Sequence, residues 1–516
     1  MYYPRLIDSY LLEWASRKTH KPLLLRGARQ VGKSTAIRHL AENFENFVEI
    51  NFEKQASYKS LFNGRDIDVK KTISQISAIA GKRVEPGKTL LFLDEVQACP
   101  EAIMSLWFFK EDLPELHVVA AGSLLEFALE DLPSFGVGRI HSMFMFPMTF
   151  DEFLVANGEQ LLMEARNNST SSNPLAHPLY EKLVGLMRTF MLVGGMPEVV
   201  AKWVETHDYI ACQEAQDDIV VTYEDDFPKY RKKIEPTLLR LTMRSVAVQA
   251  TKKFVYSAIG GNYKAAEIKK ALDMLTKAGI VIPVTHSNAN GLPLGSEVDS
   301  SYQKMLLLDT GLMLRLLNMT TGDISELTEH ILTSDVSDLV NKGPMAEMIA
   351  GLELLHYRTP NIRHELYYWQ RHAKNSQAEV DYISSYRQTV LPIEVKAEKH
   401  RTRRAQGPDD AHRRIPRPLQ SRRPQGDNGG EAGAVRLRAF PHPQGAVGRA
   451  VQHAGDESGR GRPAGMAGGA HRPPLQDRRG CGKGSGSVRA AAAVARHATG
   501  SKPVPGGRAC RHPGDA

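Results

Sequence analysis

The sequence Gly27-Ala28-Arg29-Gln30-Val31-Gly32-Lys33-Ser34-Thr35 decides the fold of this chain. It follows the apolar run Pro22–Leu25 and leads into helix-forming residues, so we expect a strand, a loop and a helix in succession. The two glycines let the backbone wrap around an anion, and free amides at the helix N-terminus would face that anion. Lys33 is expected to reach the β- and γ-phosphates of a nucleotide, and the Ser34 hydroxyl to bind Mg²⁺. Residues 27–35 therefore predict a phosphate-binding loop, or P-loop.

A second motif, Leu90-Leu91-Phe92-Leu93-Asp94-Glu95, supports the first. Four apolar residues in a row are typical of a strand buried on both faces of a parallel sheet. Two carboxylates at the end of such a strand are costly unless they have a partner. We expect Asp94 to hold Mg²⁺ and Glu95 to polarise the attacking water. The alternative for this pair alone is a helix cap after a strand, which the nearby P-loop disfavours.

Composition bounds the class of protein. A length of 516 residues suggests three or four domains, and 42% hydrophobic residues can fill their cores. No apolar run approaches the length of a membrane span, and the N-terminus has no signal-peptide pattern. The four cysteines lie far apart and form no metal-binding pair. These features predict a soluble, reduced, cytoplasmic protein without a membrane partner.

The net charge of +8 does not describe residues 1–400, because the excess of basic residues lies in residues 401–516. This segment holds 22 basic and 8 acidic residues, which leaves 44 basic and 50 acidic residues in 1–400. It is dominated by Arg, Gly, Ala and Pro, so we expect it to be disordered. We interpret this segment as the product of a reading-frame change in a GC-rich coding sequence; a natural basic tail is the alternative. Resequencing the locus would distinguish the two.

Strands and helices alternate over residues 1–150, which predicts an α/β fold with a doubly wound parallel sheet. The expected strands are Pro22–Arg26, Phe47–Phe52, Thr89–Asp94, His117–Ala121 and His141–Pro147. Ligands of such sheets bind at the carboxyl ends of the strands. Ser123 ends the fourth strand, where it would sense the γ-phosphate or cap the next helix. Arg139 is the best candidate for an arginine that neutralises phosphate charge, and a surface role is its alternative.

Two further regions follow in the sequence. The pattern is helical from Phe150 to about Tyr230, with a break at Gly194–Glu198. Residues 236–325 then show helices followed by strands at Ile280–Val284 and Lys304–Leu308, which is the order of a winged helix. Such a domain binds DNA or docks to protein, and its modest number of lysines leaves both open.

Together these motifs resemble a family of prokaryotic AAA-type P-loop ATPases with a C-terminal domain of uncharacterised function. The resemblance covers roughly residues 1–399. Besides the two motifs quoted first, it is carried by Ala121–Glu126, Val137–Arg139, Pro147–Phe153, Gly194–Glu198 and Leu308–Leu312. It implies an ATPase core at 1–150, a helical lid at 151–235, the winged helix at 236–325 and an incomplete restriction-endonuclease-like fold at 326–400. ATP as the nucleotide also rests on this resemblance.

The terminal fold carries its own motif. Asp381 lies in Glu379–Ile383, and Glu394 and Lys396 lie in Leu391–Lys396, which looks like the D…ExK core of restriction-endonuclease-like folds. Asp381 and Glu394 would hold Mg²⁺, Lys396 would orient the water, and Glu347 would complete the cluster. The alternative is an ordinary hairpin with alternating charges.

The sequence thus supports first an ATP-driven, Mg²⁺-dependent molecular switch. An ATP-regulated DNA-binding protein or nuclease is the second hypothesis, and a non-catalytic regulatory module that grips a protein partner is the third. The physiological partner, the oligomeric state, and whether Arg139 acts within its own subunit remain open.

Overall fold

The computed structural model describes residues 2–63, 67–123, 125–132, 138–170, 172–230, 233–317, 342–371, 378–386 and 388–396. All of them belong to one unit that extends from Met1 to Phe440. Our predictions for residues 401–516 lie outside the described residues.

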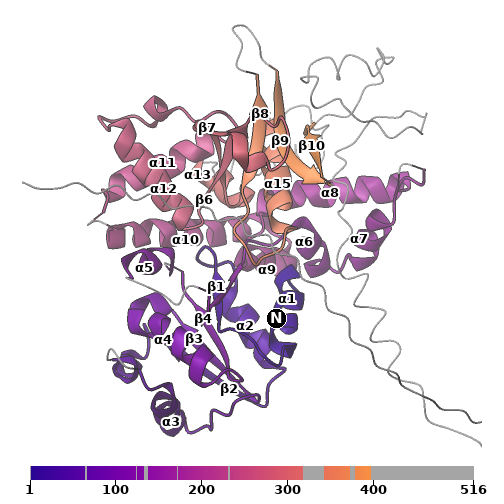
Figure 1. Ribbon diagram of the computed structural model, residues 1–516. Coiled ribbons are helices and arrows are strands. Elements are labelled where there is room, and N and C mark those ends of the chain that lie inside the picture. Colours follow the sequence, from indigo (N-terminus) through magenta and orange to yellow (C-terminus); the bar gives the residue numbers. More distant parts are fainter. Residues whose placement is uncertain are drawn as a thin grey trace, which may run out of the picture. The chain divides into compact units, whose positions relative to one another are not determined.

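Five strands form the first sheet, and each of them pairs in parallel with its neighbours (Figure 1). In chain order they are β1 (Leu23–Arg26), β2 (Asn46–Asn51), β3 (Thr89–Asp94), β4 (His117–Ala121) and β5 (His141–Phe144), and the spatial order is β2-β3-β4-β1-β5. Every residue of β3 and β4 is buried, as continuous apolar runs predict. The predicted α/β fold with a parallel sheet is confirmed.

Helices cover both faces of this sheet. The helices are α1 (Leu6–Ser16), α2 (Lys33–Ala41), α3 (Val69–Ala80), α4 (Pro100–Asp112) and α5 (Leu125–Asp131). Successive residues of a strand point to opposite faces, and the buried clusters follow this rule. Leu90 and Phe92 pack in one cluster with residues of α1 and α2, whereas Leu91 and Leu93 pack in another with residues of α3 and α4. The sheet is therefore doubly wound.

The region after the sheet is helical, as its sequence predicts. It contains α6 (Phe150–Ala156), α7 (Gln160–Asn167), α8 (His177–Val193), α9 (Pro197–Thr206) and α10 (Tyr209–Asp226). The expected break falls between α8 and α9, where Gly195 accepts a backbone hydrogen bond from Met148 N at 2.6 Å. Short 3₁₀ turns occur at Ala56–Phe62, Val96–Ala98 (η2), Phe227–Tyr230, Tyr256–Ile259 and Leu294–Glu297.

A second sheet changes the predicted organisation of the C-terminal region. Two helices, α11 (Pro236–Val248) and α12 (Ala265–Lys277), precede an antiparallel hairpin of β6 (Val281–Ser287) and β7 (Val298–Leu307). This is the expected order of a winged helix. However, β6 also pairs in parallel with β8 (Leu366–Gln370), so the hairpin belongs to a five-stranded sheet of order β10-β9-β8-β6-β7.

The remaining elements complete this sheet and its cover. They are α13 (Thr310–Leu316), α15 (Lys342–His356), β9 (Glu379–Tyr386) and β10 (Thr389–Ile393). The second sheet crosses the boundary that we predicted between residues 325 and 326, because parallel pairing joins β6 and β8 from its two sides.

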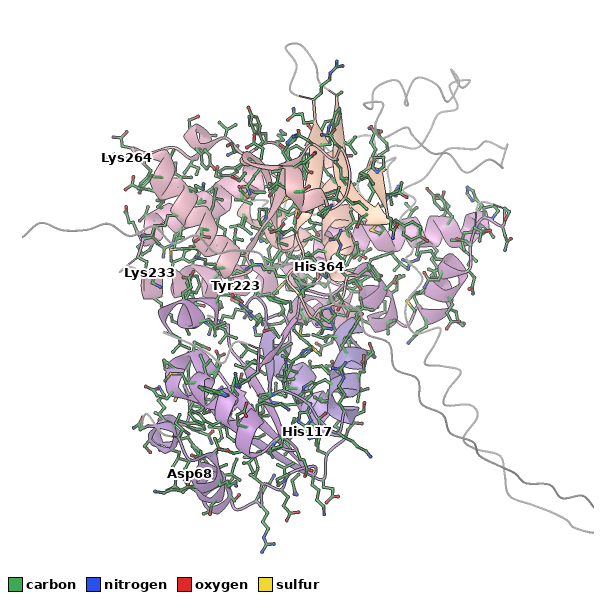
Figure 2. All side chains as sticks on the ribbon, in the orientation of Figure 1. Asp68, His117, Tyr223, Lys233, Lys264 and His364 are labelled. Atoms are coloured by element: carbon green, nitrogen blue, oxygen red, sulfur yellow. The ribbon has the colours of Figure 1, made fainter. Side chains whose placement is uncertain are left out.

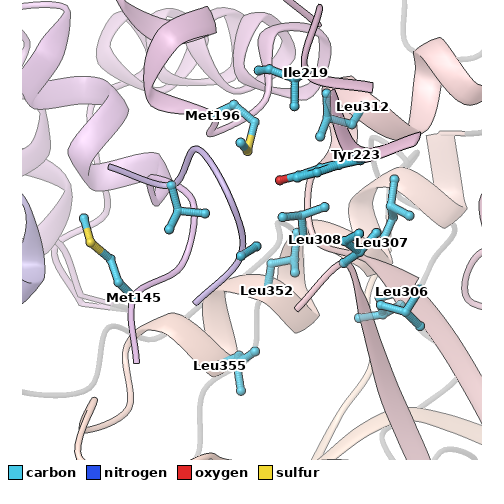
Figure 3. Close-up of a cluster of buried hydrophobic side chains, with 14 of the residues drawn as sticks. Met145, Met196, Ile219, Tyr223, Leu306, Leu307, Leu308, Leu312, Leu352 and Leu355 are labelled. Atoms are coloured by element: carbon cyan, nitrogen blue, oxygen red, sulfur yellow. The ribbon is translucent and has the colours of Figure 1, made fainter. Parts of the chain in front are cut away.

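One apolar core connects these regions. Buried side chains from the first sheet, the helical region and the second sheet form a single cluster. Figure 3 shows part of this cluster, which includes Met145, Met196, Tyr223, Leu308 and Leu352. Burial of apolar area is the main favourable term in folding, so the sequence regions that we distinguished depend on one another for stability. Among the described helices, none is long and apolar enough to cross a membrane.

Glu353 on α15 is a buried carboxyl group within this core, and only 5% of the residue is exposed. It accepts a hydrogen bond of 2.8 Å from the backbone N–H of Phe150, the first residue of α6. Burial is the main cause that raises the pKa of Glu353 from its ordinary 4.5 to about 8, and the nearby Asp151 and Glu152 add to it. The group is therefore mostly protonated at neutral pH.

We predict that Glu353→Gln makes the protein's stability less dependent on pH. The folded-state pKa is raised, so the stability from this group is full below pH 4.5 and is lost as the pH rises through 8. At about 1.4 kcal/mol per pKa unit, the rise from 4.5 to about 8 corresponds to a total loss of about 5 kcal/mol in the wild type. Denaturant unfolding between pH 5 and pH 9 measures it, with the exposed Glu164→Gln as control. Equal pH slopes for wild type and Glu353→Gln would contradict this.

Candidate functional site

The predicted P-loop connects β1 to α2 at the carboxyl edge of the first sheet. Gly32 caps α2 in the left-handed conformation, with φ of 96°, and among the described residues no side chain is seen to bond the amides of the first turn. These N–H groups and the positive end of the helix dipole are thus available to an anion. The local geometry fits a phosphate group at this position.

Lys33 lies across the loop. Its ammonium group donates hydrogen bonds to Ala28 O at 2.7 Å and to Gly27 O at 3.0 Å, and the residue is buried. Burial lowers the pKa of Lys33 to about 8, although the carboxylates of Glu95 and Asp94 oppose this shift. A phosphate oxygen next to Lys33 would favour the charged form of this lysine, because an anionic partner stabilises a buried ammonium group.

Asp94 and Ser34 meet as the sequence predicts. The Ser34 hydroxyl donates to Asp94 Oδ1 at 3.1 Å, and the amide of Asn51 donates to Oδ2, also at 3.1 Å. Burial raises the pKa of Asp94, and the neighbouring Glu95 raises it further. A carboxylate beside a hydroxyl in such surroundings suits Mg²⁺, which takes oxygen ligands and would neutralise the charge. The described residues therefore fit the ion.

Asn51 was not found by sequence reasoning. It ends β2 and is the direct register partner of Asp94 on β3. The sequence signal for Asn51 is a polar residue at the end of an expected strand. To use this signal, one must also know that β2 and β3 are neighbours in the sheet.

Glu95 follows Asp94 in the left-handed conformation, with φ of 48°. Non-glycine residues adopt this conformation at an energetic cost, and such strain clusters at functional sites. The amide of Gln97 donates to Glu95 Oε2 at 2.6 Å. The hydroxyl of Ser123 lies 3.5 Å from the same oxygen. The structure thus brings Glu95 and Ser123 together, and it adds Gln97, which sequence reasoning missed.

The P-loop also contacts the regions that follow the first sheet. Arg29 donates to both carboxylate oxygens of Asp226, the last residue of α10, at 2.7 Å each. Tyr223, labelled on α10 in Figure 2, donates through its hydroxyl to Arg29 O at 2.8 Å. Gly279, just after α12, lies so close that a Cβ there would be 3.2 Å from Ala28 N. Arg29, Ser123, Tyr223 and Asp226 also line one pocket.

Arg139 lies at the opposite edge of the sheet. It is two residues before β5, and its Nε contacts Glu111 Oε1 at 2.6 Å near the end of α4. Its guanidinium lies 4.9 Å from the ring centre of Trp107. Helix α4 has 13 residues and connects the end of β3 to the start of β4. It therefore spans the sheet from one edge to the other, and its length of about 20 Å gives the distance between the two edges. The structure therefore does not bring Arg139 to the P-loop.

The predicted D…ExK residues are only partly brought together. Carboxylate oxygens of Glu347, Glu379 and Asp381 lie within 4.8 Å of one another. Glu394 instead pairs with Lys396, and both side chains are exposed. Lys396 still acts electrostatically on Asp381, which accepts a hydrogen bond of 2.7 Å from Val395 N.

A lysine that sequence reasoning missed lies within this cluster. Lys304 on β7 is 2% exposed and forms ion pairs with Glu347, at 2.7 Å, and with Glu379. Burial is the main cause that raises the pKa of Glu347 to about 7. Two of the three carboxylates thus already share an ion pair with one ammonium group, so the donor set fits Mg²⁺ less well than the site at Asp94 does.

Comparison with known families identifies the first region. Residues 19–154 match the family model described as AAA domain, and this range includes the P-loop, Asp94, Glu95 and Ser123. Residues 19–154 are thus similar to AAA domains. Residues 185–323 match a domain of unknown function, DUF8612, and residues 342–421 match another, DUF4143. The last match runs beyond residue 400, where we placed the start of the tail.

Solved structures with some likeness include the Walker-type ATPase PABY2304 of Pyrococcus abyssi, at 16% identity and a TM-score of 0.39, over 61% of this chain and 96% of that one. Another is Aeropyrum pernix ORC1 in complex with DNA, at 11% identity and a TM-score of 0.26, over 63% and 94%. At such TM-scores the likenesses support no inference about function. No curated protein matches the chain.

We predict that Lys33→Ala weakens MgATP binding to the ATPase domain about 100-fold, because it removes a charged partner of the phosphates worth about 3 kcal/mol. Titration calorimetry on the full chain measures the affinity. Lys18→Ala, which removes an exposed lysine outside the loop, serves as control. Unchanged affinity in the Lys33 variant would exclude the role that we assign to this side chain.

Proposed function

We propose that this protein is a Mg²⁺-dependent ATPase that acts as a conformational switch. In this proposal the P-loop amides and Lys33 bind the phosphates of ATP. Ser34 and Asp94 hold the ion, which would neutralise charge on the phosphate oxygens. The AAA domain match and the fit of the described side chains to a nucleotide support these roles.

Glu95 is the proposed general base. It takes a proton from water as the water oxygen attacks the γ-phosphorus. The bond from this phosphorus to the bridging oxygen then breaks, and its electron pair stays on the β-phosphate of ADP. Lys33 and Asp94 are buried. Charged groups interact more strongly in such surroundings than in bulk water, which would stabilise the charges that separate in this step.

The contact between Arg29 and Asp226 carries the switch part of the proposal. It joins the nucleotide loop to α10, 197 residues further along the chain. Asp226 is buried and also accepts from Lys229 at 2.7 Å, so the carboxylate is well held in this arrangement.

A nucleotide would compete for Arg29. The planar guanidinium group bonds phosphate oxygens as well as a carboxylate, and Arg29 belongs to the loop that would cradle the phosphates. Bound ATP would therefore draw Arg29 away from Asp226, and hydrolysis would return it. In this way the state of the nucleotide would change the position of α10 and of the elements packed on it.

The two other hypotheses have less support. The ion pairs of Lys304 with Glu347 and Glu379 occupy carboxylates that a nuclease would use for its metal. Pairing of β6 with β8 places the expected winged-helix hairpin within a larger sheet. A purely structural regulatory module would leave the strained backbone of Glu95 without a purpose.

We predict that Glu95→Gln preserves MgATP affinity but lowers the turnover rate by a factor of about 100 or more, because the general base is lost. Phosphate release at saturating ATP measures turnover, and calorimetry measures affinity. Glu53→Gln, an exposed change after β2, is the matched control. Turnover near the wild-type rate in the Glu95 variant would refute the assigned role.

We also predict that Asp226→Asn increases MgATP affinity about threefold to tenfold, because Arg29 loses a charged competitor of the phosphate worth about 1 kcal/mol. The ATP-dependent change in amide hydrogen exchange of α10 should shrink at the same time. The neighbouring Asp225 is exposed, so Asp225→Asn is the control. If ATP changes the exchange of α10 equally in wild type and Asp226→Asn, this contact is not the switch.

A further inference from the structure

Gln97 is placed where it can control Glu95. It lies in the short turn η2 (Val96–Ala98), two residues after the proposed general base. Its Nε2 donates a hydrogen bond of 2.6 Å to Glu95 Oε2. A hydrogen bond to an ionised carboxylate is short and stronger than one between neutral groups. Because both residues lie in one tight turn, the bond restricts the carboxylate of Glu95 to a narrow set of orientations.

The end of β4 is shaped around this amide. A Cβ at Gly122 would lie 2.0 Å from Gln97 Oε1 and 3.1 Å from its Cδ. The residue at this position must therefore be glycine if Gln97 is to stay where it is. The next residue is Ser123, whose hydroxyl lies 3.5 Å from the same carboxylate oxygen, Oε2 of Glu95. Two elements thus converge on one oxygen of the carboxylate.

The amide of Gln97 is not arranged for stability alone. Its Oε1 is buried and has no hydrogen-bond partner among the described residues. Exchanging the oxygen and nitrogen of the amide would not help, because an oxygen would then face the Glu95 carboxylate. A buried acceptor without a partner is costly and calls for an explanation. The backbone of Glu95 is strained in the same turn. The energetic costs of the strained backbone and of the unpartnered Gln97 oxygen therefore both fall next to the Glu95 carboxylate.

We infer that Gln97 is a positioning residue for hydrolysis: its hydrogen bond fixes Oε2 of Glu95 and leaves Oε1 to accept the proton of the attacking water. This inference rests on the proposed function and deepens it. Gln97 does not touch the substrate, and it acts on the reaction only through Glu95. Its loss lowers the rate of the chemical step and leaves nucleotide binding as it is, because the P-loop contacts are separate from η2.

The experiment uses the full chain and the variant Gln97→Met, which fills similar space but has no donor. We expect kcat for ATP to fall roughly 10- to 100-fold, with KM and MgATP affinity within about twofold of wild type. Gly122→Ala displaces the amide without changing Gln97 itself, and it should lower kcat in the same way. Gln160→Met, an exposed change on α7, is the control that leaves kcat unchanged.

A double variant separates positioning from a general structural role. Because Gln97 acts through Glu95, adding Gln97→Met to Glu95→Gln should cause almost no further loss of kcat. Losses that multiply, or a wild-type kcat in Gln97→Met, overturn the inference while the proposed ATPase function stands. A wild type that binds MgATP without turnover overturns the proposed function together with this role, so the two failures are distinguishable.

Discussion

Parallel strands end at a common edge, and the functional part of this molecule depends on that constraint. The chain enters the P-loop after β1, reaches Asp94 and Glu95 after β3, and reaches Ser123 after β4. These segments are far apart in sequence, but neighbouring strands β3, β4 and β1 bring them side by side. Apolar side chains packed on both faces of the sheet hold the strands in this order. The polar groups at the edge of the sheet therefore depend for their positions on this apolar packing.

The fold could be predicted from the sequence because its signals are local, and the same signals pointed to residues that the structure brings to one edge of the sheet. Continuous apolar runs mark β3 and β4, and the glycine-rich loop lies between a strand and a helix as required. Asn51, Gln97 and Asp226 escaped prediction for a different reason. Their contacts depend on strand register for Asn51, on the tight turn after Glu95 for Gln97, and on a separation of 197 residues for Asp226. No single-sequence periodicity carries such information.

The C-terminal region shows the limits of motif reading. The resemblance to a D…ExK core suggested that Glu394 would join Asp381, but Glu379 takes that place and Lys304 arrives from β7. The lysine could not have been found from the motif, because it precedes Glu379 by 75 positions and reaches the cluster only through pairing of β6 with β8. Arg139 was likewise chosen for its chemistry, and its place at the amino edge depends on the direction of β5.

Pairing of β6 with β8 has a practical consequence. A fragment that stops at residue 325, near the end of the second family match, would keep the hairpin and lose its partner strand. The N–H and C=O groups of β6 would then form an open strand edge, which recruits other chains and leads to aggregation. Recombinant fragments that contain β6 should therefore extend through β10.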